Sequence, residues 1–192
     1  MKLSKVFVYM FFVASSIGAQ EIPSTSDSPR VHITTTLGSF VIELNPNRAP
    51  FTVESFLQYA EEGHYEGTIF HRVIPGFLAQ AGGYSEDLQV KLRERSVVNE
   101  SGNGLSNLRG TIGLARTNDP HSGNAQFYIN LDDNLDLNPR PTRWGYAVFG
   151  TVVEGMEVVD EIGHRPTGPQ GHLARDVPTT AIVIEQVEIL TQ

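Results

Sequence analysis

Alternating hydrophobic and polar residues begin the regular part of the chain. Hydrophobic side chains such as Val31 and Phe40 recur at every second position over residues 31–36 and 39–44. This period is typical of half-buried strands. Gly38, in the short break between the two stretches, suits the turn of a hairpin. The sequence therefore predicts an N-terminal β-hairpin.

The period changes after Pro50. Hydrophobic residues now recur at positions i, i+3, i+4 and i+7, namely Val53, Phe56, Leu57 and Ala60. This spacing places them on one face of a helix, for which Pro50 suits the first turn and Gly63 the end. A second, shorter helix is predicted over residues 156–162.

Short runs rich in β-branched and aromatic residues fill much of the remaining chain. They cover residues 69–73, 77–80, 112–115, 126–130, 148–153 and 181–189. With the hairpin they make eight strands, which together with two helices predict a mainly β fold, either a barrel or a sandwich with helical plugs. Closure of a barrel would protect the strand edges. The long connections 84–108 and 154–180 are predicted to be functional rims or irregular cover.

The N-terminus has the pattern of a secretory signal peptide. Lys2 and Lys5 precede an apolar run and a stretch of small residues that ends at Ala19. The apolar run is too short to cross a bilayer. We therefore expect a signal peptide over 1–19, a flexible leader over 20–30, one folded domain over 31–192, and an exported protein. The periplasm is the first expected destination and release into the medium the second.

Composition narrows the classes of partner. The chain has 192 residues, 40% of them hydrophobic, which suits one globular domain. A net charge of −8 without a basic cluster argues against a nucleic-acid partner. There is no cysteine to form a disulfide or carry a lipid. The six histidines lack metal-ligand spacing. We expect a monomer without cofactor, metal or membrane contact after signal cleavage.

Residues 70–84 carry the most distinctive chemistry, because they combine one arginine, one amide and two large apolar side chains. Arg72 stays charged and presents a fork of donors, so it can bind a weak acceptor but cannot act as a general base. Strand alternation places Gln126 and Tyr128 on one face. These residues could bind a peptide, or Arg72 could be a structural partner of one of the 22 acidic residues.

Five motifs strengthen the first interpretation: residues 70–77 (FHRVIPGF), 80–83 (QAGG), 109–116 (RGTIGLAR), 126–130 (QFYIN) and 145–150 (GYAVFG). Their content and order resemble the cyclophilin family of peptidyl-prolyl cis-trans isomerases over nearly the whole mature chain. The resemblance implies a closed eight-stranded antiparallel β-barrel capped by two α-helices, with a peptide groove on the outer face. It also implies substrates that are unfolded or flexible polypeptides containing Xaa-Pro bonds.

The family's roles transfer by position. Arg72 matches the catalytic arginine, Gln80 the glutamine that holds it, and Phe77 the catalytic-pocket phenylalanine. The proline pocket is further implied at Leu78, Tyr128 and Leu137. The remaining groove contacts are implied at His71, Ala115, Arg116, Gln126 and Tyr146.

Some positions depart from the family pattern. Tyr128 carries a hydroxyl that needs a partner if it is buried. Asp136 stands where eukaryotic members place the tryptophan used by cyclosporin, so weak cyclosporin binding is expected. These two residues keep a rival hypothesis open, a proline-directed peptide-binding module or chaperone with negligible catalysis. His71 is interpreted as a structural histidine rather than an acid-base catalyst.

Overall fold

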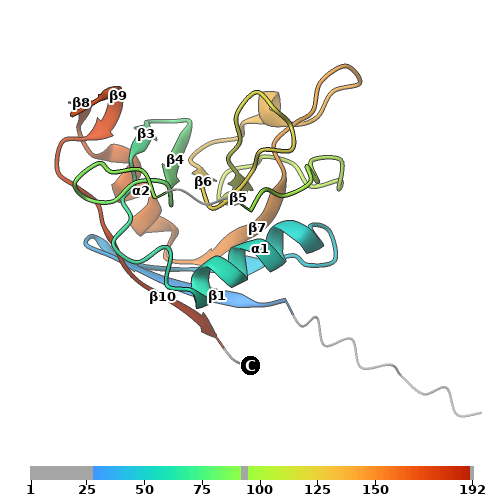
Figure 1. The fold of residues 1–192 in the computed structure, drawn as a ribbon, viewed down its shortest axis with the longest axis horizontal. Coiled ribbons are helices and arrows are strands. Elements are labelled where there is room, and N and C mark those ends of the chain that lie inside the picture. The colour runs from blue at the N-terminus through green and yellow to red at the C-terminus, as the bar shows by residue number, and fades with distance from the viewer. Residues whose placement is uncertain (1–27, 92–94, 191–192) are drawn as a thin grey trace, which may run out of the picture.

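The computed structural model describes residues 28–91 and 95–190. The signal peptide predicted over 1–19 and most of the leader predicted over 20–30 lie outside the described residues. The described part contains one eight-stranded antiparallel sheet, one two-stranded sheet, two α-helices and a short 3₁₀ helix (Figure 1). No helix in these two ranges is long and apolar enough to span a membrane.

The large sheet has the strand order β10-β1-β2-β7-β5-β6-β4-β3. Its strands are β1 (Arg30–Thr35), β2 (Gly38–Leu44), β3 (Arg72–Ile74), β4 (Leu78–Ala81), β5 (Thr111–Leu114), β6 (Phe127–Asn130), β7 (Val148–Glu154) and β10 (Ile184–Leu190). Each coincides, within a few residues, with one of the eight runs predicted from the sequence. The predicted hairpin is confirmed as β1 and β2, whose register pairs Ile33 with Phe40.

Both predicted helices are confirmed. Helix α1 (Pro50–Glu61) has its proline in the first turn. It ends before Gly63, which adopts a φ of 65° and donates its backbone N–H to the carbonyl oxygen of Ala60 at 3.0 Å. A positive φ suits glycine, which has no Cβ to clash. Helix α2 (Met156–His164) runs slightly past its predicted end and packs near β2, β3 and β4.

The predicted closed barrel is wrong, because the sheet is strongly curled but open. Its outer strands, β3 and β10, do not pair with each other. The two edges meet through the segment before β3 instead. Phe70 donates its N–H to Ile182 O at 3.0 Å, and Ile184 donates its N–H to Thr68 O at 2.8 Å. A three-residue β3 leaves no length for a full ladder that would close the sheet.

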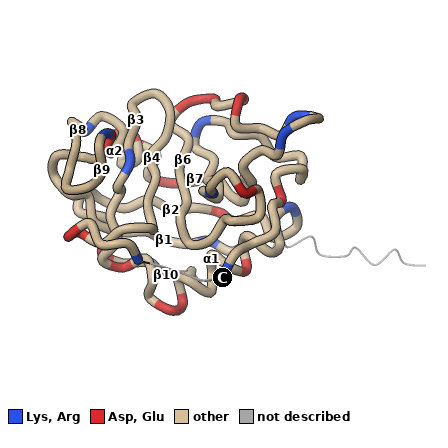
Figure 2. The backbone as a smooth tube through the Cα atoms, turned by 45° about the horizontal axis from the view of Figure 1, so that its top comes forward, with Lys and Arg blue, Asp and Glu red and all other residues tan. Residues whose placement is uncertain are grey.

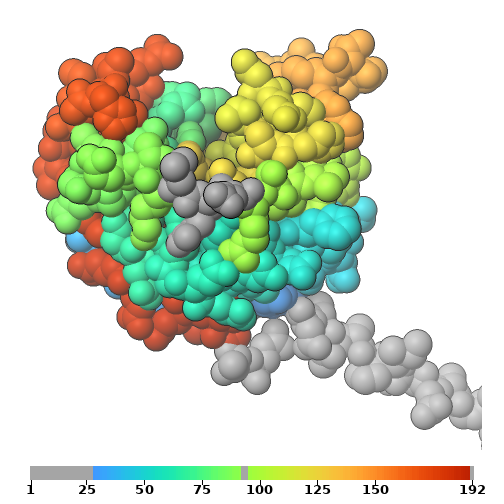
Figure 3. Space-filling model, in the orientation of Figure 1, coloured from blue at the N-terminus to red at the C-terminus, as the bar shows by residue number. Residues whose placement is uncertain are grey.

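A second sheet occupies part of the connection 154–180, which the sequence predicts to be a functional rim or irregular cover. Strands β8 (Thr167–Gln170) and β9 (Leu173–Pro178) form a hairpin that lies beside β3 (Figures 1 and 2). Their sequences, TGPQ and LARDVP, lack hydrophobic alternation, so the sequence pattern gave no strand prediction. The hairpin covers the outer edge of the large sheet. In the space-filling view, the β3–β4 region lies recessed between this hairpin and the segment leading into β6 (Figure 3).

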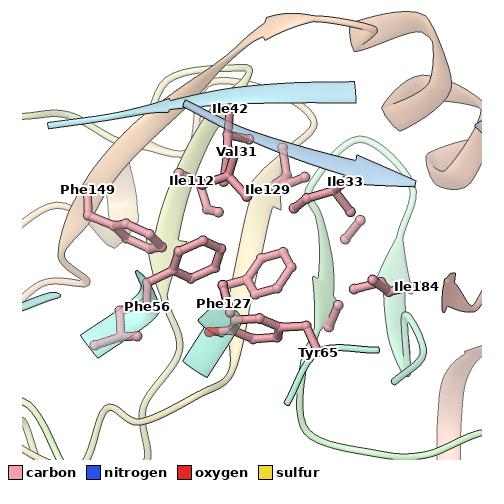
Figure 4. Close-up of a cluster of buried hydrophobic side chains, with 14 of the residues drawn as sticks. Val31, Ile33, Ile42, Phe56, Tyr65, Ile112, Phe127, Ile129, Phe149 and Ile184 are labelled. Carbon is pink, nitrogen blue, oxygen red and sulfur yellow. The ribbon is translucent and has the colours of Figure 1, made fainter. Parts of the chain in front are cut away.

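The core lies inside the curled sheet and centres on aromatic rings (Figure 4). Phe127 of β6 is fully buried and meets Phe56 of α1 edge-on, with ring centroids 5.6 Å apart. Tyr65 approaches Phe127 in the same manner at 5.5 Å. Because successive strand residues face opposite sides, inward-facing Phe127 directs Gln126 and Tyr128 to the outer face.

Replacing Phe127 with alanine is expected to lower the free energy of unfolding by about 3–5 kcal/mol, since it removes a buried ring and leaves a cavity. Guanidinium denaturation monitored by circular dichroism measures this loss. Phe51→Ala is the control, because 58% of Phe51 is exposed; that change is expected to stay within about 0.5 kcal/mol. Equal losses in the two variants would contradict the assigned core.

Candidate active site

Four neighbouring strands place three of the candidate residues, together with Gly113, in one row across the outer face of the sheet. The register pairs Arg72 of β3 with Gln80 of β4, Gln80 with Tyr128 of β6, and Tyr128 with Gly113 of β5. Neighbouring strands lie about 4.8 Å apart. A cation, an amide and an aromatic ring therefore follow one another across three neighbouring strands.

A chain of hydrogen bonds holds the polar end of this row. Arg72 donates through Nη1 to Gln80 Oε1 at 3.3 Å, and Gln80 donates through Nε2 to Gln126 Oε1 at 2.9 Å. Gln126 fits because Gly83 has no side chain: a Cβ there would come within 2.4 Å of Gln126 Cδ. The Arg72 side chain remains 39% exposed, so its guanidinium can meet a ligand.

Tyr128 forms the apolar end of the row and is only 2% exposed. Its ring lies over Gly113, where a Cβ would come within 2.3 Å of the ring. The expected hydroxyl partner is present, because the Tyr128 hydroxyl donates to Asn107 Oδ1 at 2.7 Å. Burial, with a smaller effect from Tyr146, raises the pKa of Tyr128. The hydroxyl therefore stays protonated and offers no base.

Tyr146 and Arg116 extend the site beyond Tyr128. The Tyr146 ring meets the Tyr128 ring edge-on, with ring centroids 6.1 Å apart, and the Arg116 guanidinium carbon lies over the Tyr146 ring, 4.4 Å from its centroid. Arg116 also donates to the carbonyl oxygens of Gly145 at 3.1 Å and Trp144 at 2.9 Å. This arginine is thus fixed by the backbone that surrounds it, and it supports the position of the Tyr146 ring.

The other residues predicted to line a proline pocket come from elements next to the row. Leu78 is buried in β4, two residues before Gln80. Phe77 is partly buried at the turn into β4, and its carbonyl accepts the Leu131 N–H at 2.9 Å. Leu137 belongs to the 3₁₀ helix η1 (Leu135–Leu137) and accepts the Tyr146 N–H at 2.9 Å.

Ala115 joins the same region through the backbone, because its N–H donates to Gln126 O at 2.9 Å. All eleven predicted site residues therefore belong to one connected part of the molecule. Asp136, by contrast, turns outward: its side chain is 93% exposed and pairs with Arg140.

His71 is a buried, uncharged neighbour of Arg72. Burial lowers its pKa to about 4, and the charge of Arg72 acts in the same direction, while hydrogen bonds with the Ile69 backbone and Gln126 oppose the shift. Its ring lies 4.6 Å from that of Tyr84. A neutral imidazole at neutral pH cannot serve as a proton donor of ordinary strength, which favours the structural interpretation.

Sequence reasoning missed Asn107, which lies within the long connection 84–108 and is fully buried. Besides the Tyr128 hydroxyl it receives a hydrogen bond from Asn130 Nδ2 at 3.2 Å. It also donates its backbone N–H to Asn138 Oδ1 at 2.8 Å. Asn107 therefore links Tyr128 both to its own loop and to the loop that contains Asn138. A polar residue in a polar loop gave no signal that would separate it from its neighbours.

Among residues 28–91 and 95–190, no group of three or more histidine, aspartate or glutamate side chains could hold a metal ion.

The family model for cyclophilin-type peptidyl-prolyl cis-trans isomerases matches residues 30–189. The chain belongs to the cyclophilin family. The match includes every residue of the row and every other predicted site residue, and the enzyme class is accordingly that of the peptidyl-prolyl cis-trans isomerases.

Bacterial relatives agree with this assignment. A peptidyl-prolyl cis-trans isomerase of Streptomyces antibioticus is 51% identical over 83% of this cyclophilin and 98% of the relative. Peptidyl-prolyl cis-trans isomerase B of Escherichia coli is 46% identical over 79% of this chain and 94% of its own. The fold resembles that of a Cryptosporidium parvum cyclophilin crystallised in the presence of the dipeptide Ala-Pro, with a TM-score of 0.68, 25% identity, and coverage of 85% and 99% of the two chains.

Gly113→Ala is expected to displace the Tyr128 ring, because the new methyl group would overlap it. We expect kcat/KM for a proline peptide to fall at least about tenfold, through loss of the shaped pocket floor. Gly102→Ala is the matched control, since a Cβ at Gly102 meets nothing within 4 Å. A Gly113→Ala enzyme as active as the control would show that this packing is unimportant for activity.

Proposed function

We propose that this cyclophilin accelerates rotation about Xaa-Pro bonds by a hydrogen bond from Arg72 to the prolyl nitrogen, while an apolar pocket holds the proline ring. The observation that carries the proposal is the row in which Arg72, Gln80 and Tyr128 lie side by side on the adjacent strands β3, β4 and β6. The hydrogen bond from Arg72 to Gln80 holds the donor at one end of this row.

The reaction needs stabilisation of a twisted bond. Amide resonance holds the bond planar, with a barrier of about 18–20 kcal/mol. At the twisted transition state this resonance is lost, and the nitrogen lone pair becomes a hydrogen-bond acceptor. A donor aimed at that nitrogen therefore binds the twisted form more tightly than either planar form. Such differential binding lowers the barrier.

Arg72 suits this role because its guanidinium keeps its charge and donates in a plane. A hydrogen bond from a charged donor is worth about 1.5–3 kcal/mol. That energy corresponds to about a ten- to hundredfold acceleration. Further acceleration has to come from elsewhere in the site.

The apolar pocket is the proposed source of the remainder. Leu78, Phe77 and Tyr128 are proposed to enclose the proline ring, with Leu137 at the margin. When the proline ring is held against an apolar surface, the carbonyl group of the residue before proline is the part that rotates. The pocket thereby fixes the orientation of the bond relative to Arg72. Exclusion of water also strengthens the contact with Arg72, since the local dielectric is low.

The proposed substrates are unfolded or flexible polypeptides containing Xaa-Pro. Arg72 is partly exposed on the outer face of the sheet, which suits a chain that passes over the surface. The predicted groove contacts at His71, Ala115, Arg116, Gln126 and Tyr146 would meet the residues that flank the proline. Weak binding of cyclosporin and a monomeric state stay predictions.

Arg72→Ala is expected to lower kcat/KM by about ten- to a hundredfold, because the transition state loses its charged donor. Arg72→Lys should recover little, since an ammonium lacks the planar fork. A protease-coupled assay on a short proline peptide measures both, with Arg109→Ala as the control because Arg109 pairs with Asp160 instead. Peptide binding by the wild-type protein without catalysis would favour the rival binding module, and an active Arg72→Ala enzyme would contradict the mechanism.

We also propose that the protein acts after export, with the periplasm as its destination. The support is the signal-like pattern of residues 1–19. Expression of the full chain in a bacterium should give a mature protein that begins close to Gln20 and is released by osmotic shock. N-terminal sequencing of that fraction measures the cleavage. An uncleaved chain confined to the cytoplasmic fraction would contradict export.

A further inference from the structure

The β8–β9 hairpin brings a carboxylate to the side of Arg72 opposite the glutamine. Asp176 Oδ2 lies 4.0 Å from Arg72 Nε, while Arg72 Nη1 donates to Gln80 Oε1. The guanidinium is therefore flanked from two elements that are far apart in sequence.

The backbone around Asp176 has an unusual shape. Asp176 adopts a φ of 64°, one of two positive values among the described non-glycine residues. The pairing of β8 and β9 is irregular next to it, because Gly168 faces Val177 but Gln170 faces Leu173. Irregularities of this kind redirect side chains and bend strands. Val177 and Pro178, which follow directly, are buried and anchor the strand.

These features together aim the carboxylate toward β3. Strand β9 lies beside β3 at the open edge of the large sheet (Figures 1 and 2). The Asp176 side chain is only 26% exposed, although Arg175, its other cationic neighbour, is 85% exposed. A regular strand with negative φ at this position would direct the side chain differently. Left-handed backbone at a non-glycine residue is unfavourable, which makes its presence beside the candidate catalytic group informative.

We propose that Asp176 is a positioning residue that holds the Arg72 guanidinium in the orientation needed for catalysis. The inference rests on the proposed role of Arg72. Arginine has a long side chain with many rotamers, and each rotamer lost on binding costs free energy. A carboxylate beside Nε and an amide beside Nη1 restrict that freedom before the peptide arrives. Preorganised donors of this kind are the more effective catalysts.

Two substitutions separate the carboxylate from the backbone. Asp176→Asn keeps the size and a residue that tolerates positive φ, and Asp176→Gly accepts this φ without strain. Both remove the charge. We expect each to lower kcat about two- to fivefold, the effect of an ion pair of modest strength, with little change in the dissociation constant of the peptide. NMR exchange measurements on a short Ala-Pro peptide give kcat, and titration gives the dissociation constant.

Asp160→Asn is the matched control. Asp160 lies on helix α2 and also forms an ion pair with an arginine, with Asp160 Oδ2 2.8 Å from Arg109 Nη2. Neither residue belongs to the candidate active site. This variant should keep wild-type kcat. If Asp176 served only to shape the backbone, the Asn and Gly variants would both keep wild-type kcat, and the inference would be overturned.

A double-mutant cycle identifies the group through which Asp176 acts. In an Arg72→Lys background, Asp176→Asn should change kcat by less than about 1.5-fold, because the guanidinium that it orients is gone. The same two- to fivefold loss in both backgrounds would mean that Asp176 acts independently of Arg72. An inactive wild-type protein would instead defeat the proposed function, whereas an active wild type with an unaffected Asp176→Asn variant would defeat this inference alone.

Discussion

The register between β4 and β6 is the constraint on which the site depends. It places Gln80 opposite Tyr128 and, one residue along, Ala79 opposite Ile129. A slip of one residue would exchange the faces of a strand, so Phe127 would leave the aromatic core and Tyr128 would enter it. The packing of Phe127 against Phe56 and Tyr65 therefore fixes the register from the inside. The same packing determines the order of groups on the outside.

Much of this fold could be predicted from local pattern. Strand alternation and helical periodicity depend on short stretches of sequence, and they located all eight strands of the large sheet and both helices. Closure of the sheet is a different kind of property, because it depends on the length of β3 and on how the segment before β3 meets residues 182–184. The β8–β9 hairpin was not predicted, because its two strands have too few hydrophobic residues to show an alternating pattern. It is held by pairing and by its position against β3.

The residues of the candidate site could also be predicted only in part. Alternation alone put Gln126 and Tyr128 on one face, and the resemblance to cyclophilins supplied the remaining positions. Neither could identify Asn107 or Asp176, whose partners lie tens of residues away or more in the chain. A polar side chain in a loop has no periodic context, so its importance becomes visible only when the fold brings its partner alongside. A buried Tyr128 hydroxyl was expected to have a hydrogen-bond partner, but the sequence did not show that this partner is Asn107.

The low pKa of His71 has a consequence for where such an enzyme can work. The imidazole beside Arg72, the proposed catalytic cation, stays uncharged down to about pH 4, and the guanidinium keeps its charge throughout. The proposed chemistry therefore involves no proton transfer at all. Neither the imidazole nor the guanidinium changes its charge above about pH 4, so these two groups keep one electrostatic state over the whole range in which folded proteins usually work.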